Sequence, residues 1–186
     1  MFDRSGNRKY LNSAERRAFL RAIQTEDDES RRAFLLTLFH TGCRISEALN
    51  VVTARVDPTN GTITFETLKR RRHGCFRAIP VPDELTKELH SLAEGKQPNE
   101  RIWKFSRPTA YRTVKAIMRA ARIVGAMACP KGLRHGHGVA CVAVKIPLTT
   151  IQKWLGHARI ETTAVYLDVL GQEERALARR LWRDSA

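Results

Sequence analysis

Four short stretches of the sequence combine cationic side chains with turn-forming residues, and a tyrosine follows the last of them. They are Thr41-Gly42-Cys43-Arg44-Ile45-Ser46-Glu47-Ala48-Leu49, Lys69 just after a β-branched run, Lys131-Gly132-Leu133-Arg134-His135-Gly136, and Leu155-Gly156-His157-Ala158 with Tyr166 nine residues beyond the histidine. Guanidinium groups are planar and match the oxygens of a phosphodiester bidentately. A tyrosine hydroxyl can act as a nucleophile. Together these residue types suit chemistry on a phosphodiester.

Taken one at a time, the same residues have ordinary structural explanations. Arg44 fits a surface ion pair, His157 fits a core histidine bonded to a carbonyl, and Tyr166 fits a packing residue of an amphipathic helix. The chemical interpretation therefore depends on their joint occurrence in this order.

The chain that must position these residues is predicted to be mostly helical. We expect helices after Asn12 or Ser13, from Ser30, over 44–52, over 83–93 and over 109–124, then short helices around Gly132, Pro147, Gly156 and Gly171, the last covering 172–183. Apolar residues recur at helical spacing in these segments. Because no linker interrupts the pattern, we expect residues 1–186 to form a single domain.

One small antiparallel β element is predicted within this helical chain. The alternating residues 62–67 and 76–81 are typical of strands, and the basic stretch 69–74 separates them. The two strands together indicate a hairpin with a highly charged tip.

The charge balance points to a polyanionic partner. The 186 residues include 33 Lys plus Arg against 19 Asp plus Glu, a formal net charge of +14. Such a surplus favours nucleic acid as the partner. An anionic membrane surface and simple solubilisation of the surface are the competing explanations.

Several classes of protein are not expected. The charged residues 1–9 do not form the apolar core of a signal peptide, and no apolar run approaches the ~18 residues of a membrane span. The four cysteines are scattered and form no CxxC pair. This pattern is typical of a protein in a reducing compartment. We therefore expect an intracellular, cytoplasmic protein, associated with the nucleoid if DNA is its partner.

In this order, the four stretches resemble the catalytic domain of the tyrosine recombinases, the phage-integrase family of site-specific DNA recombinases. The strings Gly42-Cys43-Arg44-Ile45-Ser46-Glu47 and Trp154-Leu155-Gly156-His157, with Thr162-Thr163 and Tyr166, are the most specific. The resemblance covers about residues 30–170. It implies a mixed α/β, mostly helical fold and a DNA recombination or integration activity typical of mobile genetic elements.

The resemblance assigns a role to each residue of the constellation. Arg44 and Arg134 would clamp the scissile phosphate, and Tyr166 would attack it to form a covalent 3′-phosphotyrosine bond. Lys69 matches the family's general acid, which protonates the departing 5′-oxygen, and His157 matches a residue that hydrogen-bonds the phosphate. The scheme requires no metal or nucleotide cofactor. Consistent with this, the sequence lacks a GxxxxGK[ST] loop and a convincing carboxylate cluster for Mg²⁺.

Two features depart from the family pattern. Lys131 stands where many members have a histidine, and at its usual pKa near 10.4 a lysine is a poor proton acceptor. We therefore predict an electrostatic role for Lys131, which leaves the proton of Tyr166 without an assigned acceptor. In addition, only some 30 residues precede the helix leading to Arg44, whereas family members usually carry a separate DNA-binding domain there. A minimal recombinase, a fragment and one half of a two-protein system are all compatible with this length.

Further basic residues are candidates for DNA contacts. We predict that Arg70, Arg71 and Arg72 follow the DNA backbone, with a solvated charged turn as the alternative. His135 and His137 form an HxH pattern, but no third ligand stands at a sensible spacing, so we predict packing or, for His135, a DNA contact rather than a metal site. Glu47 either orients Arg44 or is an ordinary surface glutamate.

The partners follow from the same resemblance. Double-stranded DNA is the expected substrate. Two further expectations are assembly into a tetramer on DNA and a separate protein that supplies the missing DNA-binding function. The helix at 172–183 would dock on a neighbouring protomer or pack on its own domain. A type IB topoisomerase-like activity and a non-catalytic DNA-binding protein are the alternative functions.

Overall fold

The computed structural model describes residues 6–67 and 74–168, together with 175, 178, 179 and 182. In chain order the elements are α1 (Ser13–Ile23), α2 (Glu29–Thr41), α3 (Ile45–Leu49), the 3₁₀ helix η1 (Thr53–Arg55), β1 (Val56–Asp57), β2 (Thr62–Glu66), β3 (Phe76–Pro80), α4 (Asp83–Ala93), α5 (Arg107–Ala120), α6 (Pro130–Ala143), α7 (Leu148–Leu155) and α8 (Glu161–Ala164). The prediction of a mostly helical chain with one small antiparallel sheet is confirmed.

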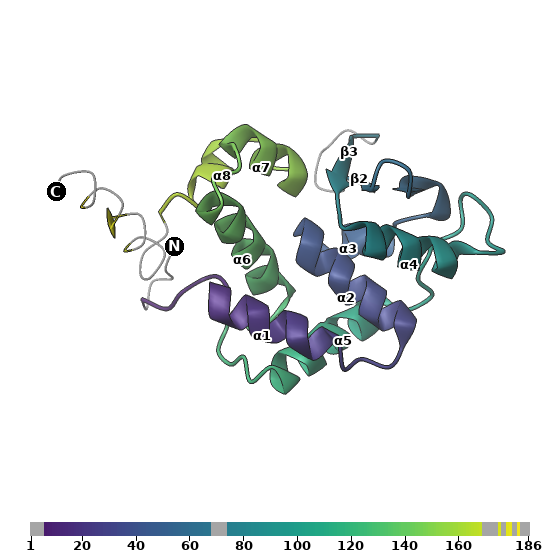
Figure 1. The fold of residues 1–186 in the computed structure, drawn as a ribbon, viewed down its shortest axis with the longest axis horizontal. Helices are drawn as coiled ribbons and strands as arrows, with labels where there is room; N and C mark the ends of the chain where they lie inside the picture. The colour runs from purple at the N-terminus through teal and green to yellow at the C-terminus, as the bar shows by residue number, and fades with distance from the viewer. Residues whose placement is uncertain (1–5, 68–73, 169–174, 176–177, 180–181, 183–186) are drawn as a thin grey trace.

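Helix α2 is the centre of the packing. It contacts α1, α3, α4, α5 and α6, and Figure 1 shows it in the middle of the helical layer. Its apolar residues Ala33, Phe34 and Leu35 are fully buried on successive positions, as expected for a helix surrounded by protein on all sides. The hydroxyls of Thr37 and Thr41 are satisfied within the helix, donating to the carbonyls four residues earlier. The end of α2, which leads to Arg44, is therefore rigidly placed.

The sheet lies beside these helices, with strand order β1-β2-β3 and antiparallel pairing throughout. Ile63 and Phe65 of β2 face the core, paired with Ile79 and Arg77 of β3. An arginine thus occupies an inward position of a strand, which requires polar partners on that side. The strands begin and end close to the predicted ranges, whereas the two-residue β1 was not predicted.

Several helix boundaries differ from the sequence prediction. Helix α2 begins at Glu29, because the Asp28 side chain accepts a hydrogen bond from the backbone of Arg31 as the N-cap. Helix α3 is limited to Ile45–Leu49 instead of 44–52, and α5 begins at Arg107 after the N-cap Ser106 rather than at 109. These shifts reflect local capping.

Helix α6 contains glycine at three internal positions, which individually disfavour a helix. They are tolerated because other parts of the chain pass close by: a Cβ on Gly136 would lie 2.7 Å from the carbonyl oxygen of Leu11, and one on Gly138 would lie 2.6 Å from the ring of Tyr166. The continuous helix Pro130–Ala143 was expected only as short helices around Gly132. Tertiary packing overrides the propensity here.

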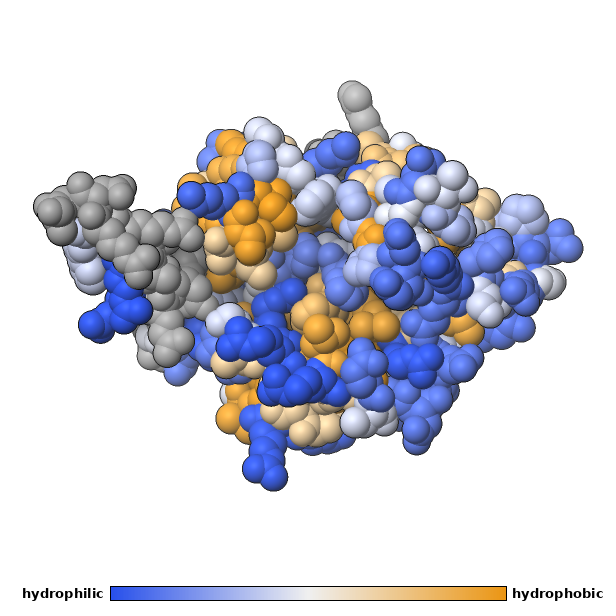
Figure 2. Space-filling model, in the orientation of Figure 1, coloured by the Kyte–Doolittle hydropathy of each residue, from blue (hydrophilic) through white to orange (hydrophobic). Residues whose placement is uncertain are grey.

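Two features of the structure concern possible partners: the polarity of the surface, and the length and apolar character of the described helices. In Figure 2 hydrophilic side chains cover much of the visible face, and apolar atoms show toward the upper left, where Figure 1 places α7 and α8, and near the centre. Across the described ranges, no helix is long and apolar enough to cross a membrane.

The aromatic core around α2 generates a stability prediction. Phe34 is fully buried and makes edge-on contacts with Trp103 and Phe105 at centroid distances of 5.3 and 5.0 Å. Phe34→Ala is expected to lower the free energy of unfolding by about 3–5 kcal/mol, measured by urea denaturation. Phe76→Ala, which truncates a largely exposed ring, is the control and should cost less than about 1 kcal/mol. Equal losses in the two variants would contradict this account of the core.

Candidate active site

Arg134 is buried and held by two helix ends. Its Nη1 donates to the carbonyl of Gly42 at 2.8 Å and its Nη2 donates to the carbonyl of Leu155 at 2.6 Å. Gly42 and Gly156 cap α2 and α7 in the left-handed conformation, with φ of +59° and +63°, which glycine adopts without steric cost. These carbonyls lie at helix C-termini, where the dipole carries partial negative charge. The glycine turns noted in the sequence therefore aim two acceptors at one guanidinium.

Arg44 is placed by the same turn and by Glu47. It is the N-cap of α3, and its backbone N–H donates to Oε2 of Glu47 at 2.8 Å. Its Nη1 pairs with Oε1 of the same carboxylate at 2.7 Å. About a quarter of the Arg44 side chain (27%) is exposed, so part of the guanidinium is free to meet a ligand while the rest is fixed.

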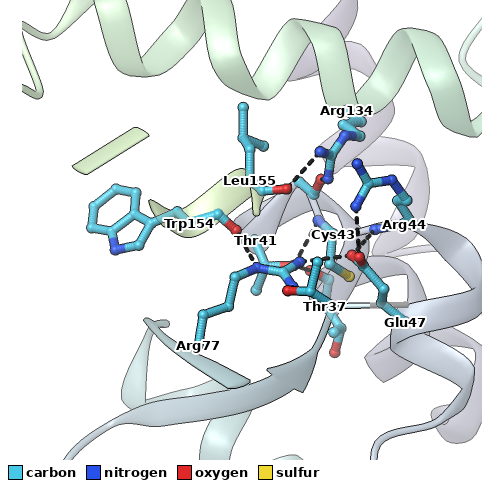
Figure 3. Close-up of polar contacts among 11 residues, drawn as sticks. Thr37, Thr41, Cys43, Arg44, Glu47, Arg77, Arg134, Trp154 and Leu155 are labelled. Carbon is cyan, nitrogen blue, oxygen red and sulfur yellow. Dashed lines mark hydrogen bonds and ion pairs between the residues drawn. The ribbon is translucent and has the colours of Figure 1, made fainter. Parts of the chain in front are cut away.

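Glu47 also pairs with a second arginine, Arg77 of β3, as Figure 3 shows. Arg77 Nη2 lies 2.7 Å from Glu47 Oε2, its Nη1 donates to Thr67 at 2.8 Å, and its Nε donates to the carbonyl of Trp154 at 2.8 Å. Burial raises the pKa of Glu47, but the cations Arg77 and Arg44 outweigh it and hold the pKa below its usual value. Glu47 is thus a buried anion that orients Arg44, the first of the two sequence interpretations.

Arg77 is a residue that the sequence reasoning missed. The sequence carried one signal for it. Residues two positions apart in a strand point to the same face, and Arg77 lies two positions before the buried Ile79 in the strand Phe76–Pro80. An arginine at a buried strand position needs a carboxylate and hydrogen-bond acceptors. Here these come from α3, from the end of β2 and from the end of α7, so one side chain joins the sheet to α3 and to α7.

Tyr166 follows α8 and is almost fully buried, with 1% of its surface exposed. Its ring packs on α6 at Gly138 and stacks on the ring of His157 at a centroid distance of 6.1 Å. Its hydroxyl lies 3.1 Å from Nδ1 of His135. Burial raises the pKa of Tyr166 above its usual value of 10, and the nearby cations Arg134 and Arg44 offset this only in part. The phenol is therefore protonated in the free protein.

His157 is neutral and fixed by a buried threonine. Its Nδ1 lies 2.9 Å from Oγ1 of Thr163, a fully buried residue whose role was not predicted beyond its motif. Burial, followed by the cations Arg134 and Arg44, lowers the pKa of His157 to about 4. As a neutral imidazole with one nitrogen engaged, it can still offer the other nitrogen to a ligand.

The structure gathers most of the predicted residues around two adjoining cavities. One, of about 540 Å³, is lined by Arg44, Lys131, Arg134, His135 and His157 among others. The other, of about 480 Å³, shares His135 and His157 with it and is lined by Tyr166. Burial, and after it the Arg44 cation, lowers the pKa of Arg134 to about 10, so two neighbouring guanidinium groups line the larger cavity.

Other predicted residues stand apart from this arrangement. Lys69, Arg70, Arg71 and Arg72 lie outside the described residues, as does most of 172–183. His137 turns away from His135: its Nδ1 faces the carbonyl of Phe39 at 3.2 Å in the core. Within the described part of the chain no three His, Cys, Asp or Glu side chains gather as a metal site.

The buried Glu47 pair generates a prediction on stability and pH. Glu47→Gln leaves Arg77 buried without its anion and should lower the free energy of unfolding by about 3–5 kcal/mol at pH 7. Because the folded pKa of Glu47 lies below its unfolded value of 4.5, this difference is complete above pH 4.5 and shrinks as the pH falls through the folded pKa.

Denaturation of both proteins across pH 3–7 provides the measurement. The control is Glu88→Gln, which removes the partly exposed pair with Arg32 and should cost about 1 kcal/mol or less. A constant difference between wild type and Glu47→Gln across this range would show that the Glu47 charge does not stabilise the fold.

Comparison with known proteins places this geometry in a family. The model of the phage integrase family matches residues 9–173. A tyrosine recombinase of Thermosipho africanus is 24% identical over 177 residues, covering 92% of this chain and 61% of that protein. The chain therefore spans about three fifths of the length of this relative.

Solved structures share the fold. The crystal structure of XerA recombinase superposes with a TM-score of 0.77 at 23% identity, covering 92% of this chain and 64% of that one. XerH site-specific recombinase bound to its difH substrate superposes with a TM-score of 0.74 at 20% identity, covering 97% and 59%. With the family model matched over most of the sequence, the chain belongs to the phage integrase family.

Proposed function

We propose that this chain is the catalytic domain of a tyrosine-type site-specific DNA recombinase or integrase, which cleaves and rejoins strands through a covalent 3′-phosphotyrosine. The observation that carries the proposal is the charge of Arg134. Both of its Nη atoms are bonded to carbonyls, and no carboxylate of the described residues lies within ion-pair distance of it. A buried cation without a counter-ion next to a second arginine is a site for an anion.

A phosphodiester satisfies this site. Its non-bridging oxygens would accept hydrogen bonds from Arg44 and Arg134, and charge that develops on them during attack is stabilised by the same groups. Neutral His157 would add a hydrogen bond to the phosphate. Lys131, an exposed lysine on the rim of the cavity, would contribute a point charge.

The covalent step is assigned to Tyr166. Its oxygen would attack phosphorus as the bond from phosphorus to the 5′-oxygen breaks, and Lys69 would protonate that oxygen. The phosphotyrosine retains the energy of the broken bond, so the 5′-hydroxyl of another strand can reverse the step. Neither a metal ion nor a nucleotide enters this scheme.

The partner in this proposal is double-stranded DNA. A formal net charge of +14 favours it, and the similar XerH structure is a complex with its DNA substrate. The same proposal includes DNA contacts by Arg70, Arg71 and Arg72 and assembly into a tetramer on DNA. It also includes docking of residues 172–183 on a neighbour, a separate DNA-binding protein and a location at the nucleoid.

Covalent trapping tests this function directly. Nicked suicide duplexes, tiled from DNA flanking the gene, are incubated with protein at low salt and resolved on a denaturing gel. Wild-type protein is expected to give a slowly migrating adduct, and Tyr166→Phe is expected to give none because it lacks the nucleophilic oxygen. Tyr111→Phe, which changes an exposed tyrosine lining the adjoining cavity of about 540 Å³, is the matched control and should retain the adduct.

The possible results separate the proposal from its alternatives. DNA binding in a gel shift without any adduct, even after addition of host lysate, would indicate a non-catalytic DNA-binding protein. An adduct accompanied by relaxation of supercoiled plasmid, but without strand exchange between two duplexes, would indicate a topoisomerase-like activity.

A further inference from the structure

The hydroxyl of Tyr166 has a hydrogen-bond partner that the proposed scheme does not use. Nδ1 of His135 lies 3.1 Å from the phenol oxygen, and the two ring centroids are 5.9 Å apart. The sequence interpretation gave packing or a DNA contact for His135. In the structure its Nδ1 meets the atom that would attack phosphorus.

Helix α6 provides the geometry of this contact with two residues on one face. His135 and Gly138 are three positions apart, a spacing that brings side chains together on a helix. Because a Cβ at Gly138 would lie 2.6 Å from Cζ of the tyrosine, only glycine lets the ring approach this closely. The close approach at Gly138 sets the ring on the helix, and the hydroxyl then reaches the imidazole one turn earlier.

We propose that His135 is the catalytic proton acceptor for Tyr166, a role that rests on the proposed function. In the cleavage step the phenol proton passes to Nδ1 of neutral His135 while the tyrosine oxygen bonds to phosphorus. The bond to the 5′-oxygen breaks, and that oxygen takes a proton from the general acid. During rejoining, the 5′-hydroxyl attacks, the phosphotyrosine bond breaks, and His135 returns its proton to the tyrosine oxygen.

The charges around His135 keep it ready to accept a proton. The pKa of His135 is lowered to about 4, and burial is the largest cause. The cations Lys131 and Arg134 of its own helix and Lys9 of the N-terminal segment also lower this pKa. His157 and Tyr166 lie beside it, Arg159 and Glu161 line the smaller cavity with it, and Arg44, Glu47, Arg107 and Cys129 line the larger one. The imidazole is therefore neutral at pH 7, and a phosphodiester bound between the arginines would offset these cations and strengthen it as a base.

This assignment also accounts for Lys131. Lys131 stands where many family members have a histidine, and it is an exposed residue on the rim of the larger cavity. With Lys131 as a nearby point charge, the acceptor for the phenol proton is found on the same helix at His135. The proposed scheme then has a separate clamp, nucleophile, general acid and general base.

The test is single-turnover cleavage of a suicide duplex by His135→Asn. Asparagine places an oxygen near the position of Nδ1, so it keeps a hydrogen-bond acceptor but takes up no proton. We expect cleavage about 100-fold slower at pH 7, because general-base catalysis typically contributes 10²–10⁴-fold. The wild-type rate should be flat from pH 6 to 9. The variant rate should rise about tenfold per pH unit, since the phenol must then lose its proton to solvent.

Two further measurements separate a proton acceptor from a structural or DNA-binding residue. DNA affinity and thermal stability of His135→Asn should match wild type, as should those of the control His90→Asn, an exposed histidine of α4. Free imidazole should restore cleavage by His135→Ala, because the adjoining cavity of about 480 Å³ admits it. It should not restore cleavage by Tyr166→Phe.

Contrary results have distinct meanings. A His135→Asn rate and pH profile equal to wild type would overturn the role of His135 and leave the proposed function standing. Weaker DNA binding with an unchanged cleavage step would identify a DNA contact instead. Absence of any adduct with wild-type protein would overturn the proposed function, and the role of His135 with it.

Discussion

The Glu47 carboxylate joins parts of the chain that are far apart in sequence, because a buried anion must be matched by cations at short range. Its two oxygens lie 2.7 Å from guanidinium nitrogens of Arg44 and Arg77. Arg77 in turn binds the end of β2 and the carbonyl of Trp154 in α7. Displacement of the sheet or of α3 would leave a buried charge unpaired, which costs several kcal/mol. Displacement of the end of α7 would leave the buried Nε of Arg77 without its acceptor, which costs about 1–3 kcal/mol. The positions of these three elements are therefore mutually determined.

This pairing occupies both oxygens of Glu47, which acts on Arg134 only at longer range, and the hydrogen-bond partners of Arg134 among the described residues are two carbonyls. The C-termini of α2 and α7 supply carbonyls to its guanidinium, and a helix terminus carries roughly half an elementary charge. Such dipoles orient the group and accept two of its five N–H donors without a full counter-charge, which leaves other donors for a ligand. Arg44 and Arg134 consequently repel each other across the cavity, as the lowered pKa of Arg134 indicates. A phosphodiester would relieve that repulsion, so the arrangement selects for an anion between them.

The sequence could predict the elements and the residues of the site, but not the contacts that organise them. Helical and strand periodicity placed α4 over Asp83–Ala93 and both main strands. It could not predict α6 as one continuous helix, because two of its glycines are explained only by the close packing of Leu11 and Tyr166 against them. Motif order identified Arg44, Arg134, His157 and Tyr166. It gave no partner for Arg77 or His135, because such hydrogen bonds join residues 30 to 77 positions apart and carry no local pattern.

Burial of Tyr166 has a consequence for when the proposed chemistry can occur. A phenolate in this position would be poorly solvated, and the two arginines offset that penalty only in part. When the tyrosine oxygen bonds to phosphorus, however, its charge passes to phosphate oxygens between Arg44 and Arg134, while the proton passes to a neutral imidazole. A free phenolate then never has to accumulate in the buried site. Arg134, which together with burial keeps His135 and His157 neutral, then becomes with Arg44 the counter-charge of the transition state, and the nucleophile stays protonated until a phosphodiester is bound.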